Sequence, residues 1–303
     1  MTSLILGAYS RLPVSLLSPF VRSLRATAFN GSLCIVAGQC DDEQRVQIGD
    51  LADAVVDVRG DYSNDFRVRR AMLNYLKRQR GLRRTYDPAF RIAARFGAER
   101  DSERRWACLE YHLEGLQALR YMYYHRYIVE RAPQADRIML TDLRDVVFQR
   151  DPFEDPLVGL EVYLEDESVR IGADAFNTRW IRELFGESLV REMTGRVVSC
   201  SGTVIGTREA MLAYCAEMMR SIVWRRRPMG EHDQAVHNAL LYEGRLPAAT
   251  AIPNGTGRVL TLGGMAAPGI DHDGLIRNSD GSVPAVLHQW DRHAALAERF
   301  SAL

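Results

Sequence analysis

The chain has 303 residues, of which 47% are apolar and 26% are charged. This composition predicts a globular protein with a large core, and it excludes a disordered, collagen-like or coiled-coil chain. The 39 basic residues balance the 39 acidic residues. Because no overall field then favours an anionic partner, we expect no nucleic-acid partner.

Cysteine usage and hydropathy indicate the compartment. Five cysteines occur without paired CxxC spacing, which predicts neither a disulfide framework nor a zinc site and favours a reducing compartment. No stretch approaches the roughly 20 apolar residues that a membrane span requires. The segment Met1–Arg11 has no basic residue before its apolar run and is not typical of a secretory signal. We expect a cytoplasmic protein without a transmembrane segment, for which peripheral membrane contact stays open.

In the first sixty residues, short apolar runs typical of strands alternate with segments whose apolar residues have helical spacing. Short apolar runs at Ser3–Tyr9, Leu33–Ala37 and Ala54–Val58 predict strands, and the last of them is typical of a parallel strand covered on both faces. Apolar residues at helical spacing predict a helix over Pro13–Ala28, and Glu43–Leu51 is a more polar helix candidate. Strands that alternate with helices predict an α/β domain with a mostly parallel sheet.

A long helical region follows over Ser102–Glu130, and a buried strand is predicted over Arg137–Thr141. Before this helical region, and overlapping its start, Phe66–Arg105 carries thirteen basic and four acidic residues. This excess of nine positive charges would suit a phosphate-binding patch, although a solvated helical face explains it as well.

The pattern changes after Asp151-Pro152. We predict strands at Leu160–Leu164 and Val197–Gly206, the second broken by Gly202, and helices at Ala175–Thr194, Glu209–Trp224 and Asp233–Tyr242. The glycine-rich stretch Ala248–Gln289 is typical of a small mixed sheet. Because no linker or repeat separates the parts, we expect a single domain over residues 1–303, with a nucleotide-binding half (1–150) and a second half (151–303).

The clearest local feature is the pair Asp142 and Asp145, which follows a buried strand. In open α/β sheets, ligands bind outside the carboxyl ends of strands. Residues three apart on a strand face opposite ways, so the two carboxylates converge only if the chain turns after Thr141. Converging carboxylates suit Mg²⁺ or Mn²⁺. The alternative is that Asp142 caps the turn and Asp145 pairs with Arg144 or with another neighbour.

Two later segments could contribute to the same chemistry. Asp233 and Gln234 open an amphipathic helix, where Asp233 is either a helix cap or a base or sugar-hydroxyl acceptor in a cleft. Near the carboxyl terminus, a strand would place His288 and Trp290 on one face, as a metal ligand beside a stacking surface. A histidine packed in the core is the alternative.

Absent motifs narrow the classes of enzyme. The chain has no HExxH, GxxxxGK[ST] or GxSxG motif, and no strand is followed by GxGxxG. These absences argue against zinc hydrolases, P-loop NTPases, α/β-hydrolases and dinucleotide oxidoreductases.

The segment Arg137–Phe153 (RIMLTDLRDVVFQRDPF) resembles the metal-binding segment of GT-A glycosyltransferases. Similar enzymes also have a glycine-containing strand like Ser199–Thr207, an Asp-Gln pair that opens a helix like Asp233-Gln234, and a late histidine like His288. The order of these features along the chain matches, and bacterial enzymes that build surface glycans are the most similar. The resemblance implies a Rossmann-type sheet with helices on both faces. This chain has two residues between the aspartates where the usual Asp-x-Asp pattern has one.

The resemblance implies a role for each matching residue. Asp142, Asp145 and His288 would bind Mn²⁺ or Mg²⁺, with Asp142 alternatively holding the ribose of the donor. Asp233 would be the catalytic residue, either as a base or by orienting donor hydroxyls. Further residues would contact the nucleotide sugar: Thr141, Asp142, Arg144, Gly202, Thr203, Gln234 and Trp290.

The function implied is metal-dependent transfer of a sugar from a UDP- or GDP-linked donor to a glycan or glycoconjugate, and residues 151–303 would face the acceptor. The late histidine favours retention of anomeric configuration. Two alternatives stay open, a sugar-nucleotide nucleotidylyltransferase and a non-enzymatic glycan- or protein-binding module. The first usually has a glycine-rich loop with a basic residue after the first strand, where this chain has only Gly7.

Overall fold

The structure is a computed structural model that describes residues 2–10, 12–38, 40–58, 116–223, 232–246 and 248–303. The basic stretch Phe66–Arg105 and the first part of the helix expected over Ser102–Glu130 lie outside the described residues.

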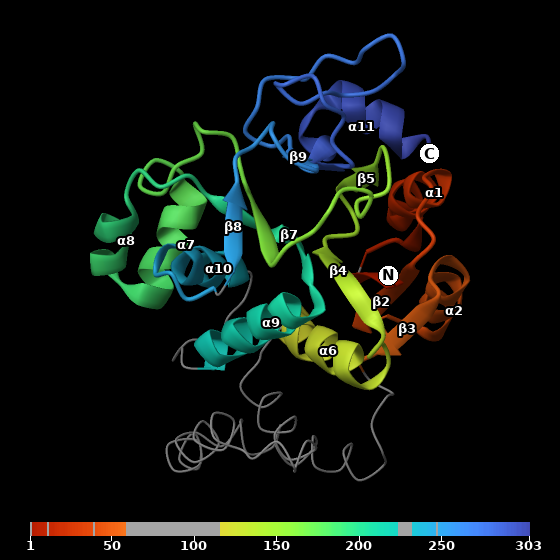
Figure 1. Cartoon of the computed structure of the whole chain (residues 1–303), viewed down its shortest axis with the longest axis horizontal. Coiled ribbons are helices and arrows are strands. Elements are labelled where there is room, and N and C mark those ends of the chain that lie inside the picture. Colours follow the sequence, from red (N-terminus) through yellow and green to blue (C-terminus); the bar gives the residue numbers. More distant parts are fainter. Residues whose placement is uncertain (1, 11, 39, 59–115, 224–231, 247) are drawn as a thin grey trace.

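A seven-stranded sheet forms the centre of the molecule, in the order β3-β2-β1-β4-β7-β6-β8 (Figure 1). Its strands are β1 (Thr2–Ser10), β2 (Ser32–Gly38), β3 (Ala54–Asp57), β4 (Ala135–Thr141), β6 (Leu160–Leu164), β7 (Ser199–Thr207) and β8 (Ala249–Ile252). Strand β7 is antiparallel to both its neighbours, β4 and β6, and the other neighbouring pairs are parallel. The prediction of an α/β fold around a mostly parallel sheet is confirmed.

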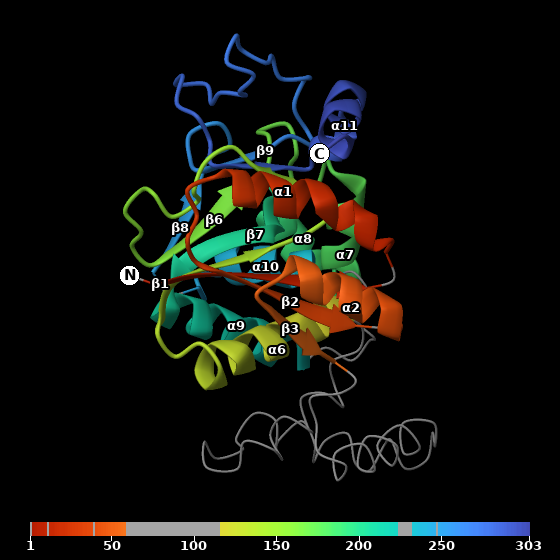
Figure 2. The same cartoon turned by 90° about the vertical axis from the view of Figure 1, so that its right-hand side faces the viewer.

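Helices cover both faces of this sheet (Figure 2). One face packs against α6 (Leu116–Glu130), α9 (Arg208–Val223) and α10 (Asp233–Tyr242). The other face packs against η1 (Val14–Leu17), α1 (Ser18–Ala26) and α2 (Asp42–Leu51). Beyond α10 lie α7 (Ala175–Phe185) and α8 (Glu187–Met193), and the chain finishes with η2 (Trp290–Arg292) and α11 (Ala294–Ser301).

Local signals explain where two of these helices start and stop. Helix α2 begins with a capping box, in which the Asp41 side chain accepts from the Gln44 N–H and the Gln44 side chain accepts from the Asp41 N–H. The single helix expected over Ala175–Thr194 is wrong. Gly186 has a φ of 89°, which interrupts the helix and separates α7 from α8.

A second, three-stranded sheet has the order β5-β10-β9. It consists of β5 (Val146–Phe148), β9 (Val259–Thr261) and β10 (Val286–His288), with β10 antiparallel to β5 and parallel to β9. The prediction of a small mixed sheet is confirmed. It is not confined to the expected stretch Ala248–Gln289, because β5 comes from the first half of the chain and β8 joins the central sheet instead.

Candidate metal centre

The chain bends sharply between the two aspartates. Strand β4 ends at Thr141, residues 143–145 form a bend, and β5 starts at Val146. Leu143, at the middle of the bend, is 3% exposed and packs against the backbone of Gly7 in β1, where any side chain would overlap it. This apolar contact anchors the bend, so the turn expected after Thr141 is present.

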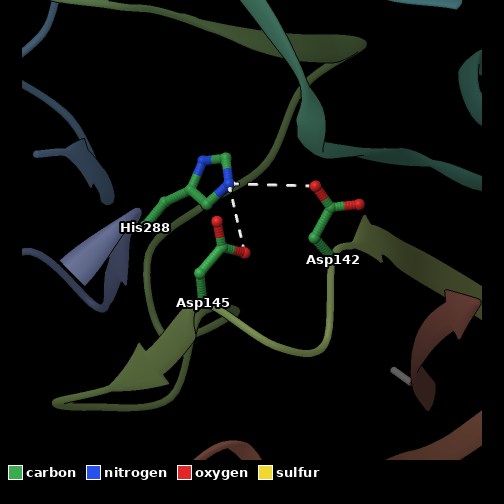
Figure 3. Close-up of side chains that lie close together, drawn as sticks. All are labelled: Asp142, Asp145 and His288. Carbon is green, nitrogen blue, oxygen red and sulfur yellow. Dashed lines mark ion pairs between the residues drawn. The ribbon is translucent and has the colours of Figure 1, made fainter. Parts of the chain in front are cut away.

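The small sheet brings His288 to the same bend. His288 ends β10 and pairs with Val146, the residue after Asp145, and the N–H of Gln289 donates to the Asp145 carbonyl at 2.8 Å. His288 Nε2 then lies 3.9 Å from Asp145 Oδ1 and 4.0 Å from Asp142 Oδ2 (Figure 3). One potential ligand atom from each residue lies within 4.8 Å of the other two. The structure therefore brings together the three residues expected to bind the metal.

The cluster is partly buried and negatively charged. Asp145 is 7% exposed and His288 is 1% exposed, whereas the Asp142 side chain is 42% exposed and opens the cluster to solvent. Burial is the largest cause of a raised pKa at Asp145, which Asp142 and Asp291 raise further, against the effect of His288. The separations of 3.9 and 4.0 Å are too long for hydrogen bonds. Two carboxylates and an imidazole nitrogen therefore converge without being hydrogen-bonded to one another, as in a divalent-cation site.

Gly202 provides the space in front of this cluster. A Cβ atom on Gly202 would lie 2.5 Å from Asp142 Oδ2 and 2.8 Å from His288 Cε1. The carbonyl of Gly202 accepts from the Asp142 N–H at 2.7 Å, which fixes β7 against the bend. The break predicted at Gly202 is absent, since β7 runs continuously through this residue. Only the pairing of β7 with β6 is irregular there: Val162 pairs with Val204, and the next residue of β6 pairs with Cys200. A side chain at position 202 would fill the space between the ligands.

Arg120 is a site residue that the sequence analysis missed. This arginine of α6 is 8% exposed and donates from Nη1 to Asp142 Oδ1 at 2.8 Å and from Nη2 to Asp233 Oδ2 at 2.6 Å. The Tyr121 hydroxyl donates to the same Asp233 oxygen at 2.9 Å. The sequence signal was an arginine inside the otherwise uncharged run Ala118–Tyr124, which predicts a buried cation in need of partners.

The first turn of α10 lies at the same edge of the sheet. Asp233 is not the helix cap, because His232 occupies that position. Its carboxylate is buried and paired with Arg120. Gln234 Nε2 donates to Asn177 Oδ1 at 2.9 Å, and Gln234 Oε1 accepts from the Ser201 N–H at 3.4 Å. Both predicted residues therefore lie next to the strand that carries Gly202.

Trp290 does not share a face with His288, and that prediction is wrong. Strand β10 ends at His288, and Gln289 adopts the left-handed conformation with a φ of 60°. The chain therefore turns, and Trp290 packs with Leu287 and Phe300 in the core beside the small sheet, 5% exposed. In this conformation its indole is not a stacking surface for a ligand at the cluster.

The other predicted nucleotide-sugar residues lie around the cluster. Thr141 and Thr203 are paired on β4 and β7, and Thr203 Oγ1 is a buried atom without a hydrogen-bond partner in the described structure. The Arg144 side chain is 45% exposed, 4.0 Å from Asp145 and 3.1 Å from Asp291. Arg144 thus lies at the solvent side of the cluster. Its closer ion pair is with Asp291, so the close Arg144–Asp145 pair considered as an alternative is not formed.

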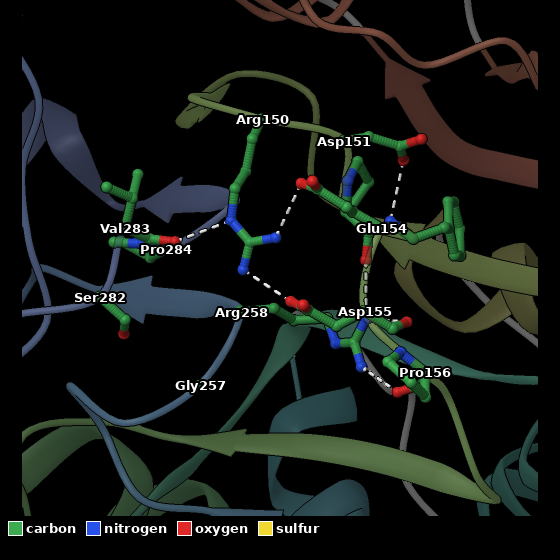
Figure 4. Close-up of polar contacts among 12 residues, drawn as sticks. Arg150, Asp151, Glu154, Asp155, Pro156, Gly257, Arg258, Ser282, Val283 and Pro284 are labelled. Atoms are coloured by element: carbon green, nitrogen blue, oxygen red, sulfur yellow. Dashed lines mark hydrogen bonds and ion pairs between the residues drawn. The ribbon is translucent and has the colours of Figure 1, made fainter. Parts of the chain in front are cut away.

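Two arginines hold the small sheet in place beside the central one (Figure 4). Arg258, which precedes β9, donates to both oxygens of Glu161 in β6, at 2.8 and 3.0 Å, and to the carbonyl of Pro152 at 2.9 Å. Arg150, which follows β5, donates to the Val283 carbonyl at 2.8 Å and to Asp155 Oδ2 at 2.6 Å. These contacts fix the position of β10 and of its last residue, His288.

A second group of possible ligands, Asp271, His272 and Asp273, lies on an exposed loop. Asp271 Oδ1 accepts from the N–H groups of Asp273 and Leu275, and its Oδ2 accepts from Arg277. The Asp271 carboxylate thus already stabilises the loop, and no observation points to an ion there.

No family model matches the chain, and the comparison with curated proteins found no match. Within the described residues, none of the helices combines the length and hydropathy needed to cross a membrane.

Proposed function

We propose that the chain is a metal-dependent glycosyltransferase of the GT-A type, which moves a sugar from a UDP- or GDP-linked donor to a glycan or glycoconjugate in the cytoplasm. The observation that carries this proposal is the convergence of Asp142, Asp145 and His288 where β4 leaves a mostly parallel sheet. Nucleotides and other ligands bind at this edge in open α/β folds. Mn²⁺ or Mg²⁺ is the cofactor that the donor set favours.

Each residue has a role that its surroundings support. A divalent cation held by the three ligands would neutralise charge on the departing diphosphate. Arg144, half exposed beside the ligands, is placed to contact donor phosphates. Arg120 holds the Asp142 carboxylate in place and leaves its Oδ2 directed toward His288. Thr203, whose hydroxyl has no hydrogen-bond partner among the described residues, and Gln234 are proposed to contact the sugar. We propose that the transfer retains the anomeric configuration.

The alternatives have less support. The one glycine of β1 that would suit a nucleotidylyltransferase loop, Gly7, lies against Leu143. This contact explains why position 7 is a glycine, so a phosphate bound to its backbone is not needed as an explanation. A binding module would not need an almost buried carboxylate, Asp145, beside two other carboxylates, Asp142 and Asp291.

Hydrolysis of a panel of UDP- and GDP-sugars, measured with Mn²⁺ and with EDTA, tests the proposal. We expect release of the nucleoside diphosphate from at least one donor with Mn²⁺ and none with EDTA. Asp145→Ala should lose this activity and remain folded, because the buried Asp145 carboxylate makes only long ion-pair contacts within the described residues, at 3.9 and 4.0 Å, so its truncation removes little stabilisation. The matched control Glu192→Gln changes an exposed carboxylate on α8 and should behave as the wild type. Full Mn²⁺-dependent turnover by folded Asp145→Ala protein would contradict the proposal.

A further inference from the structure

Glu165 lies at the same sheet edge as the metal cluster. Strands β4 and β6 both pair antiparallel with β7, so they run in the same direction and their carboxyl ends meet at one edge. Asp142 is the first residue after β4, and Glu165 is the first residue after β6. Glu165 carries no distinctive sequence signal, because its neighbour Asp166 and the exposed Glu167 make this stretch look like an ordinary acidic loop.

Glu165 is buried and has no ion-pair partner among the described residues. The residue is 7% exposed, and in the described part of the chain its carboxylate has one side-chain hydrogen bond, from Gln234 Nε2 at 3.5 Å, and no ion pair. The charges that affect the pKa of Glu165 are those of Asp174 at the start of α7 and Arg292 in η2, and burial and the Glu165 charge in turn raise the pKa of the Cys200 thiol of β7. A buried carboxylate at a ligand-binding edge, with such weak pairing, is typical of a functional group.

The first turn of α10 connects Glu165 to the metal cluster. Asp233 is joined through Arg120 to Asp142, and the next residue, Gln234, contacts Glu165. The Cys200 thiol contacts Gln234 at 3.5 Å, and it experiences the charges of Glu165 and of Asp142. Glu165 is therefore close to the proposed donor site without touching any of the three metal ligands.

We propose that Glu165 binds the attacking hydroxyl group, that of water or of the acceptor sugar, by accepting its hydrogen bond. This assignment rests on the proposed glycosyl transfer and names the side chain that faces the second substrate. The acceptor must approach from the part of the edge that the donor leaves free. The β6 end, one strand beyond β7, provides that position.

The environment of Glu165 makes the assignment pH-dependent. Burial, supported by the charge of Asp174, raises the pKa of Glu165 to about 7, against the effects of Arg292 and Gln234. The ionised carboxylate is the stronger acceptor, because charge-assisted hydrogen bonds are roughly twice as strong as neutral ones. Donor hydrolysis should therefore rise as the pH increases through about 7.

Glu165→Gln tests the assignment, with Glu167→Gln as the matched control on the exposed side of the same loop. The probe is Mn²⁺-dependent hydrolysis of the most active UDP- or GDP-sugar. We expect Glu165→Gln to lower kcat by roughly 10- to 100-fold, to leave the KM for donor and the Mn²⁺ affinity unchanged, and to abolish the rise near pH 7. Hydrolysis by Glu165→Gln with the wild-type kcat and pH profile overturns the assignment and leaves the proposed function intact. If the wild-type protein neither binds Mn²⁺ nor hydrolyses any donor, the proposed function fails and the assignment fails with it.

Urea unfolding of the two proteins gives a readout that is independent of activity. The pKa of Glu165 is raised in the folded state from an ordinary value of 4.5 to about 7. The stability that a protonated Glu165 confers is thus present below pH 4.5 and is lost as the pH rises through about 7. Relative to Glu165→Gln, the wild-type protein should become less stable between pH 5 and pH 8. An equal pH dependence in both proteins overturns the assignment.

Discussion

At Gly202 the lack of a side chain determines whether the three ligands share an open space. We predict that Gly202→Ala raises the dissociation constant for Mn²⁺ about 10- to 100-fold, because the new methyl group would lie between Asp142 and His288. Isothermal calorimetry measures this. The control is Gly49→Ala on α2, where an added Cβ meets nothing within 4 Å and where alanine favours the helix.

Unchanged Mn²⁺ binding by folded Gly202→Ala protein would show that the cation binds at another place. The comparison is informative because the backbone of Gly202 has an ordinary strand conformation, which alanine can adopt. A loss of binding would then reflect the occupied space and not a distorted β7.

Two helices and a strand end depend on one buried ion-pair network. Arg120 on α6 holds Asp142 after β4 and Asp233 on α10. We predict that Asp233→Asn lowers the free energy of unfolding by about 3 kcal/mol, since it leaves a buried cation with one partner fewer. Glu183→Gln, which breaks the more exposed pair with His232, should cost less than about 1 kcal/mol. Equal costs in urea titrations would contradict the network's role.

Elements defined by local patterns could be predicted from the sequence. β6 and α10 have the predicted bounds, Leu160–Leu164 and Asp233–Tyr242, because apolar period and flanking polar residues agree there. β5 was missed, since three residues between a bend and a loop carry no periodic signal and the partner strand lies far along the chain. The split between α7 and α8 depends on the positive φ of one glycine, Gly186, which the helical pattern hides.

For the candidate site, too, the residues with local sequence signals could be predicted, and the residues placed by packing could not. Asp142 and Asp145 follow a strand directly, so their position at the sheet edge is a local property. Glu165 also follows a predicted strand directly, but only the order of β4, β7 and β6 brings that strand end to the edge that carries the aspartates. Arg120 reaches the same place through the packing of α6, and no short pattern encodes either arrangement. Trp290 was misplaced because a single non-glycine residue, Gln289, takes a left-handed conformation.

For the molecule as a whole, cation binding should be coupled to folding. The ligands come from the ends of two sheets, so the unfolded chain offers no comparable site. We predict that Mn²⁺ at 100 times its dissociation constant raises the free energy of unfolding by about 2.7 kcal/mol. Urea unfolding with and without Mn²⁺ measures this gain, and Asp145→Ala should show none. An equal gain in that variant would indicate binding at other positions.

The packing of Leu143 against Gly7 has a consequence for how inactive variants are interpreted. A random mutagenesis screen would find substitutions at position 7 among those that abolish function. Because a glycine near the end of a first strand resembles a nucleotide-binding loop, such substitutions could be taken as evidence of a bound nucleotide. Such a result would reflect crowding of a hydrocarbon side chain that displaces two distant aspartates. Sensitivity to mutation at this position therefore measures the shape of the bend and not the affinity of any bound molecule.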